Sequence, residues 1–169
     1  MNNRNILKYL SGACFAILAI WSLARVNVAL FWWMCAAVGA ILMAVAAATS
    51  IKALMVIGCV LRIIFHLENI FFYFQNPHIF YGVGGGISNT SRISLAFTFG
   101  WVLVYSILIV TALNKSIAKK CGIIAAMLVT VICVGMVMIN LRAMYILTNC
   151  VPMILGCFAY GCSISYPHE

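Results

Sequence analysis

Residues 28–48 read VALFWWMCAAVGAILMAVAAA and contain no charged side chain. A helix of about 20 apolar residues spans the hydrocarbon core of a bilayer, where only helices and closed barrels satisfy the hydrogen bonds of the backbone. Similar apolar runs occupy residues 6–24, 53–74, 93–113, 121–139 and 143–162. These runs are continuous and lack the alternating pattern of barrel strands. The sequence therefore predicts an all-α, polytopic integral membrane protein with six transmembrane helices.

The composition indicates the same class of protein. Of the 169 residues, 66% are apolar and 7% are charged, and 10 Lys and Arg stand against 2 Asp and Glu. Soluble domains are about half apolar and about a quarter charged. The basic residues lie singly or in small groups between apolar runs, without the basic and aromatic patch that phosphate binding requires. We therefore expect the lipid bilayer, and not nucleic acid, as the surroundings of this chain.

Most of the predicted connections are very short, as at residues 25–27, 49–52 and 140–142. Short links make consecutive helices antiparallel neighbours. The longer link, 75–92, contains three consecutive glycines but none of the other residues of a phosphate-binding loop. The prediction is one compact antiparallel bundle over residues 1–169, without a soluble domain.

The basic residues also predict an orientation in the membrane. Apart from Arg62, three basic residues fall on one side and six on the other, namely Arg25, Arg92 and Arg142 against Arg4, Lys8, Lys52, Lys115, Lys119 and Lys120. Lys and Arg in short loops favour the cytoplasmic side. We therefore expect both termini in the cytoplasm, residues 75–92 outside, and a location in the cytoplasmic membrane.

An alternative for the first span is a cleaved signal peptide. Its start is basic, and Ser22-Leu23-Ala24 has the small-x-small pattern of a cleavage site. Cleavage there would leave five spans. We favour retention of the segment, because Trp21 crowds the site and the apolar run is long enough to cross the membrane.

The third predicted span, 53–74, contains polar residues that lipid disfavours. Arg62, His66 and Asn69 recur at i, i+4 and i+7, so they share one face of the helix. Glu68 lies well round the helix from Arg62. Each of these two charges costs roughly 2.5–3.5 kcal/mol at the centre of a span, so this helix needs neighbours that shield its polar side.

Ionisable residues inside a membrane are by default functional hypotheses. We expect a solute-binding site lined by residues from the third span and the last link, namely Arg62, His66, Glu68, Asn69 and Arg142. We expect Glu68 to pair with an arginine near its level in the membrane, namely Arg25, Arg92 or Arg142, or with Arg62 if the helix is tilted. The alternative interpretation, equally favoured, is a structural ion pair that holds the bundle together.

Small residues form a ladder in the second span, where Ala36, Ala40, Ala44 and Ala48 occupy every fourth position. Small residues let helix backbones approach each other closely in lipid. We interpret the ladder as a packing surface within the bundle. The alternative is a docking face for another membrane protein or for a second copy of the chain.

Motifs of known chemistry are scarce, because the sequence contains no HExxH, no GxSxG and no paired carboxylates. We therefore predict no catalytic residue, no cofactor and no metal, and interpret the eight cysteines as packing residues. Two weaker alternatives remain. Cys150, Met153 and Cys157 share a helical face that would suit Cu(I), and a thiol enzyme would use Cys150 with His78. Pro152 predicts a kink in the last helix.

In size, six-helix topology and outward polar cluster, the chain resembles the substrate-binding subunits of energy-coupling-factor vitamin transporters. The resemblance is one of architecture and no residue motif carries it. It implies solute binding and a membrane partner docked through small-residue stripes. The sequence therefore favours a protein that binds or transports a small solute through an outward-facing polar cavity. The alternatives are an accessory or structural subunit that docks another membrane protein and, behind it, the thiol-dependent membrane enzyme.

Overall fold

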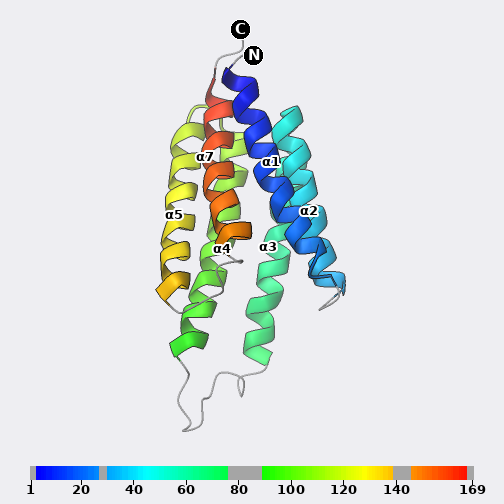
Figure 1. Cartoon of the computed structure of the whole chain (residues 1–169), viewed down its shortest axis with the longest axis vertical. Coiled ribbons are helices and arrows are strands. Elements are labelled where there is room, and N and C mark those ends of the chain that lie inside the picture. The colour runs from blue at the N-terminus through cyan, green and yellow to red at the C-terminus, as the bar shows by residue number, and fades with distance from the viewer. Residues whose placement is uncertain (1–2, 27–29, 76–88, 139–145, 167–169) are drawn as a thin grey trace.

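A computed structural model describes residues 3–26, 30–75, 89–138 and 146–166, with only the backbone given at position 73 and at 89–94. This part of the chain is helical, with short turns (Figure 1). The elements are α1 (Asn3–Leu23), α2 (Leu30–Thr49), α3 (Lys52–Gln75), α4 (Asn89–Leu113), α5 (Ala118–Met138), the short π-helix η2 (Ile146–Cys150) and α7 (Val151–Ser165). Because η2 runs directly into α7, the two form a single sixth rod.

All six rods are long and apolar enough to cross a membrane. The most apolar window of each has a mean hydropathy between 1.4 and 2.6. The predicted all-α bundle of six spanning helices is therefore confirmed. The helices α4 and α5 begin four and three residues before the predicted apolar runs, at Asn89 and Ala118. The difference arises because an apolar run leaves out a polar first turn of its helix. In α4 this turn contains Asn, Thr and Ser at 89–91, which are residue types that favour helix starts.

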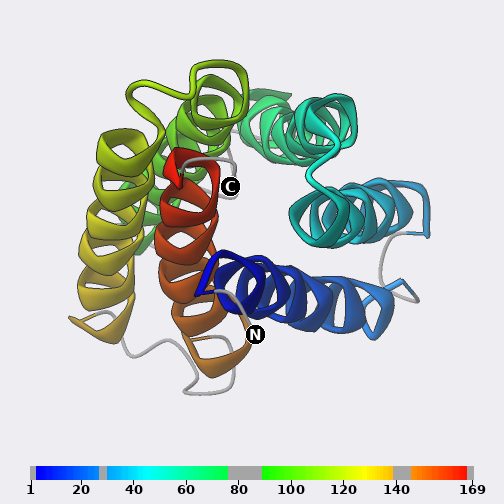
Figure 2. The same cartoon turned by 90° about the horizontal axis from the view of Figure 1, so that it is seen from above.

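The helices form a ring in chain order. Each one packs against the next, and α7 closes the ring by contacting both α5 and α1 (Figure 2). The start of α1 and the end of α7 lie at the same end of the bundle (Figure 1). At the turn between α2 and α3, Ser50 takes a positive φ of 64°, and its N–H donates to the carbonyl of Ala46 at 2.7 Å.

Two pairs of facing glycines bring neighbouring helices together. Between α2 and α3, a Cβ added to Gly58 would lie 2.6 Å from the carbonyl oxygen of Gly39. Between α5 and α7, a Cβ added to Gly161 would lie 2.8 Å from the Cα of Gly122. Real Cβ atoms do not come this close to other atoms, so each contact requires glycine on both helices.

The alanine ladder of α2 lies within the bundle. Ala36 and Ala40 are fully buried, while Ala44 and Ala48 lie beside Gly12 of α1. These contacts are the close backbone approaches that the ladder predicted within the bundle. Large apolar side chains point outward along every rod, as with Ile20 at 67% exposure. Such an outer surface suits lipid as the solvent.

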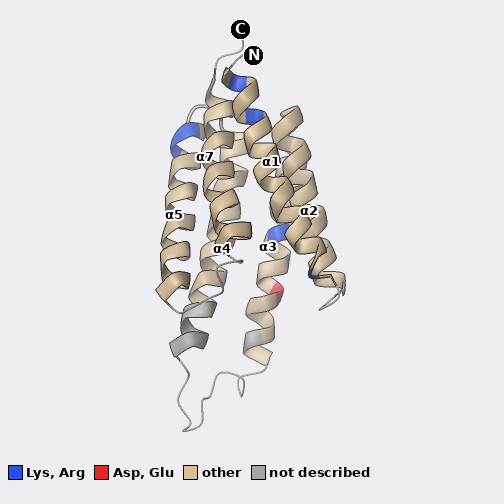
Figure 3. Cartoon of the chain, in the orientation of Figure 1, with Lys and Arg blue, Asp and Glu red and all other residues tan. Residues whose placement is uncertain are grey.

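Charged residues are unevenly distributed over the described helices. Basic residues gather at the end of the bundle that holds the termini, in the first turns of α1 and α5 (Figure 3). A basic and an acidic residue also interrupt the middle of α3 (Figure 3), and these are Arg62 and Glu68. Because ionisable residues within a membrane-spanning helix are by default functional hypotheses, the surroundings of Arg62 are the candidate functional site.

Candidate functional site

Arg62 lies near the middle of α3 and is 5% exposed. Its Nε donates to the Tyr105 hydroxyl of α4 at 2.9 Å. Its Nη1 donates to the Ser22 hydroxyl of α1 at 3.1 Å and faces the Ala36 carbonyl of α2 at 3.4 Å. One guanidinium thus joins α3 to three other helices.

The partners of Arg62 are neutral oxygens and aromatic rings. Its Cζ lies 5.3 Å from the ring centroid of Tyr105 and 5.9 Å from that of Phe65, both within the range of cation–π attraction. The Ser22 hydroxyl donates to the Leu18 carbonyl at 2.9 Å, which leaves its lone pairs for Arg62. The charge is therefore stabilised by dipoles and ring faces, without a carboxylate among the described residues.

The glycine contact between α2 and α3 makes room for this arginine. A Cβ added to Gly39 would lie 3.1 Å from the Arg62 Cγ and 2.8 Å from the Gly58 carbonyl oxygen. A side chain at position 39 would therefore press on both the helix contact and the stem of Arg62. Gly39 therefore allows both the close packing of α2 on α3 and the path of the Arg62 side chain toward α1.

His66 lies one turn further along α3 and is 7% exposed. Its ring is nearly parallel to that of Trp101, with an interplanar angle of 10° and centroids 6.1 Å apart. It is also stacked on Tyr105, with centroids 5.7 Å apart. The three rings and the Arg62 guanidinium form one group, which we call the polar cluster.

Two nitrogen atoms of the polar cluster lack a hydrogen-bond partner. They are Nε2 of His66 and Nε1 of Trp101, and both are buried within the described part of the chain. An unsatisfied buried polar atom costs about 1–3 kcal/mol, and such atoms in folded proteins call for an explanation. Nε1 of Trp21 on α1 is also buried without a partner, so what distinguishes the polar cluster is that two such atoms belong to stacked rings beside Arg62.

Asn69 and Glu68, two further predicted site residues, make contacts of other kinds. The Asn69 side chain donates to the Phe65 carbonyl of its own helix at 2.8 Å. Glu68 lines a wide surface groove of about 630 Å³ together with Trp32, Ile64, Leu67, Ile70, Phe71 and Phe74. No ion pair joins Arg62 to Glu68 in the structure described here, since Arg62 turns toward α1, α2 and α4.

Three predicted elements fall outside the residues that the structure describes. These are Arg142, His78 and most of the 75–92 link. Of the arginines proposed as partners of Glu68, Arg25 lies 4.6 Å from the Trp21 ring centroid. The side chain of Arg92 is not described either. A Glu68 pairing with Arg92 or Arg142 therefore stays a prediction.

The predicted soft-metal face of the last helix is fully buried at Cys150, Met153 and Cys157. The Cys150 thiol contacts the sulfur of Met136 on α5 at 4.0 Å. Among the described residues, no three His, Cys, Asp or Glu side chains converge as metal ligands would. The π-helical turn η2 ends two residues before Pro152, and the kink predicted at this proline stays a prediction.

The sequence did not point to Tyr105, Trp101 or Ser22. Trp101 and Tyr105 are four residues apart in the fourth apolar run, so an aromatic pair on one face of α4 was readable. The helix that this face of α4 contacts depends on how the six helices pack, and residue spacing within α4 cannot predict it.

Comparisons with protein-family models, with curated proteins and with solved structures give no match to this chain. The resemblance to vitamin-transporter subunits therefore stays a prediction from architecture.

Proposed function

We propose that this chain binds a small polar solute inside the ring of helices, with His66 and Trp101 as its contact groups and Arg62 as the nearby charge. The observation that carries the proposal is the pair of buried, unpartnered ring nitrogens on α3 and α4. Their rings are stacked beside a fixed guanidinium, so all three groups are held in place before any solute arrives. Preorganised polar groups of this kind are typical of small-molecule sites.

The chemistry of the cluster indicates the kind of solute. The Trp101 N–H can only donate a hydrogen bond, while a histidine ring nitrogen can donate or accept. The cation of Arg62 favours partial or full negative charge nearby. A solute with a carbonyl or carboxylate oxygen suits these groups best. Asn69 and Arg142 of the predicted site would contact the solute nearer the outer face of the membrane. If the bound solute can leave on both sides of the membrane, the protein transports it.

The test compares the small molecules released from purified wild-type protein and from His66→Phe after denaturation. Phenylalanine keeps an aromatic ring beside Trp101 and Tyr105 but removes both ring nitrogens. We expect a stoichiometric compound from the wild type and its loss from the variant, with an unchanged melting temperature. The same compound in equal amount from both proteins would contradict the proposal.

The surroundings of Glu68 favour a second function, the docking of another membrane protein. The groove around Glu68 lies on the outer surface of α3, where Leu67 is 48% and Phe71 61% exposed. A carboxyl group among apolar side chains is costly in lipid, and a donor on a partner protein would offset that cost. Under this function, Glu68→Gln loses a co-purifying membrane protein and keeps the bound solute. Loss of the solute would place Glu68 in the first function instead.

The proposed orientation follows from the basic residues. With both termini in the cytoplasm, His66 lies on the outer side of Arg62 along α3. This orientation can be tested with Ser50→Cys and Ser116→Cys, each introduced alone into a cysteine-free variant. In intact cells, a membrane-impermeant thiol reagent should label neither, and labelling of both would reverse the orientation.

A further inference from the structure

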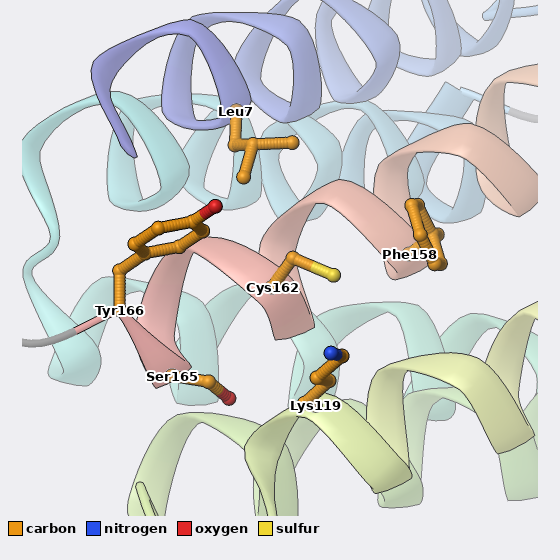
Figure 4. A pocket seen from close by; sticks show the side chains of 6 residues that line it. All are labelled: Leu7, Lys119, Phe158, Cys162, Ser165 and Tyr166. Atoms are coloured by element: carbon orange, nitrogen blue, oxygen red, sulfur yellow. The ribbon is translucent and has the colours of Figure 1, made fainter. Parts of the chain in front are cut away.

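A second pocket lies far from the polar cluster, at the end of the bundle that holds the termini. It has a volume of about 440 Å³ and is lined by Leu7 of α1, Lys119 of α5, and Phe158, Cys162, Ser165 and Tyr166 at the end of α7 (Figure 4). The floor of the pocket is α7, and α1 and α5 form its walls. The facing glycines Gly122 and Gly161 draw α7 close to α5 just below.

The polar groups of this pocket suit a phosphate. Figure 4 shows Lys119 and Cys162 facing each other across the pocket, with the Tyr166 hydroxyl turned into the same space. The ammonium and the phenol can both donate hydrogen bonds to an anion. Ser165 is already committed as a donor, because its hydroxyl donates to the Gly161 carbonyl at 2.9 Å.

The charge of this end of the bundle adds to the attraction. Lys119 and Lys120 lie in the first turn of α5, where the helix dipole is also positive. A smaller pocket of about 120 Å³ at the same end is lined by Arg4, Lys52 and Lys115, with Ser50 and Ile164. Among the residues that the structure describes, no acidic side chain lines either pocket, and Glu68 lies in the C-terminal half of α3.

An apolar strip leads away from the pocket along the outside of α7. Val151, Leu155 and Phe158 recur at i, i+4 and i+7, and they are 39%, 46% and 47% exposed. The strip is about 10 Å long, given a rise of 1.5 Å per residue. The two wall helices also carry exposed apolar side chains, such as Leu10 on α1 and Met127 on α5. A free phosphate ion would make no favourable contact with such a strip, whereas an acyl chain would pack against it.

We propose that this pocket binds one anionic phospholipid, with its phosphate at Lys119 and Tyr166 and one acyl chain along Phe158 and Leu155. The proposal is independent of the solute site, because it uses other residues at the opposite end of the bundle. The lipid would fill the groove between α1 and α5 and thereby stabilise the closure of the ring by α7. An increase in melting temperature on lipid addition follows from binding to the folded state alone.

The test is native mass spectrometry of the full chain in mild detergent, titrated with dioleoyl phosphatidylglycerol. We expect one retained lipid per chain in the wild type and about tenfold weaker retention in Lys119→Gln, as the loss of one charged hydrogen bond implies. The matched control is Lys120→Gln, which removes an exposed lysine next to the pocket that does not line it. This variant should retain the lipid like the wild type.

Further arms of the experiment separate the sources of the phosphate. Tyr166→Phe should also weaken retention, and it gives a second variant if Lys119→Gln fails to fold. Inorganic phosphate at millimolar concentration should not displace the lipid, and dioleoyl phosphatidylcholine should bind more weakly. Equal losses in Lys119→Gln and Lys120→Gln would overturn the proposal, since only general surface attraction would then remain. Displacement by inorganic phosphate, or equal binding of both lipids, would overturn it as well.

Discussion

The two glycine contacts of the bundle resemble each other in geometry and differ in what surrounds them. At Gly39 and Gly58, α2 and α3 meet beside a buried arginine that hydrogen bonds to α1 and α4. At Gly122 and Gly161, α5 and α7 meet without a charged side chain among the atoms nearest the contact. Close approach of backbones is thus the common way in which this chain packs in lipid. The arginine is an addition to one contact, and its desolvation cost indicates a role beyond packing.

The largest effect is expected from Gly58→Ala. The new Cβ would meet the Gly39 carbonyl oxygen at 2.6 Å, so the backbones of α2 and α3 must separate. We expect a loss of about 3 kcal/mol, the upper end for overpacking, together with loss of the bound solute. Melting followed with a thiol-reactive dye measures the first effect, because Cys59, Cys150 and Cys157 are fully buried until the protein unfolds.

Gly161→Ala and Gly12→Ala serve as controls for that prediction. The Cβ of Gly161→Ala would meet the Ala118 carbonyl oxygen at 2.7 Å, so stability should fall by a similar amount while solute binding is kept. The Cβ of Gly12→Ala would lie 3.2 Å from the Ala44 carbonyl oxygen, and the loss should be smaller. Equal loss of the solute in Gly58→Ala and Gly161→Ala would erase the distinction between the two contacts.

The next effect is expected from Tyr105→Phe. This change removes the oxygen that accepts from the Arg62 Nε at 2.9 Å and leaves a buried charged donor without that partner. Hydrogen bonds to charged groups contribute about 1.5–3 kcal/mol, so we expect a loss of about 2 kcal/mol in the same melting assay. Tyr9→Phe is the control, since Tyr9 is 59% exposed. Equal melting temperatures for the two variants would show that the bond to Tyr105 does not hold Arg62.

A smaller effect is expected from Ser22→Ala. The Nη1 of Arg62 loses the Ser22 hydroxyl but keeps the Ala36 carbonyl at 3.4 Å, so we expect a loss of about 1 kcal/mol. Ser163→Ala is matched closely, because Ser163 is 2% exposed and also donates to its own helix, at the Tyr160 carbonyl. A loss in Ser163→Ala as large as in Ser22→Ala would mean that Arg62 adds nothing to the role of Ser22.

The smallest effect on stability is expected from Arg62→Met. Methionine removes the desolvation cost of the buried charge, and this gain offsets the cost of leaving the Tyr105 hydroxyl without its partner. We therefore expect a melting temperature close to that of the wild type and loss of the bound solute. A large drop in melting temperature with the solute retained would make Arg62 a structural residue.

Sequence reasoning predicted the helices and part of the polar cluster. The six rods were predictable because long apolar runs leave the backbone few options in a membrane. The shared face of Arg62 and His66 was predictable from their spacing, and both lie in the polar cluster. Their partners were not predictable, because the rotation of α4 about its axis depends on contacts with α3 and α5 that no local pattern contains.

For Glu68, too, the sequence predicted the position of the side chain but not its neighbours. Its position round the helix from Arg62 was readable, and the structure places it in the outer groove with Trp32. Whether that groove faces lipid or another protein depends on a surface beyond this chain. The pocket proposed to bind lipid was equally hidden in the sequence, since Leu7 and Lys119 lie on α1 and α5 and Tyr166 directly follows α7.

The central claim is that the polar cluster binds a solute, and native mass spectrometry of tagged protein from its own membranes tests it most directly. The comparison is Trp101→Phe against Trp21→Phe, because both residues carry a buried indole nitrogen without a partner and only Trp101 belongs to the cluster. We predict a stoichiometric small molecule on the wild type and on Trp21→Phe, and none on Trp101→Phe. A wild-type protein without any small molecule, or the same molecule on all three proteins, would contradict the claim.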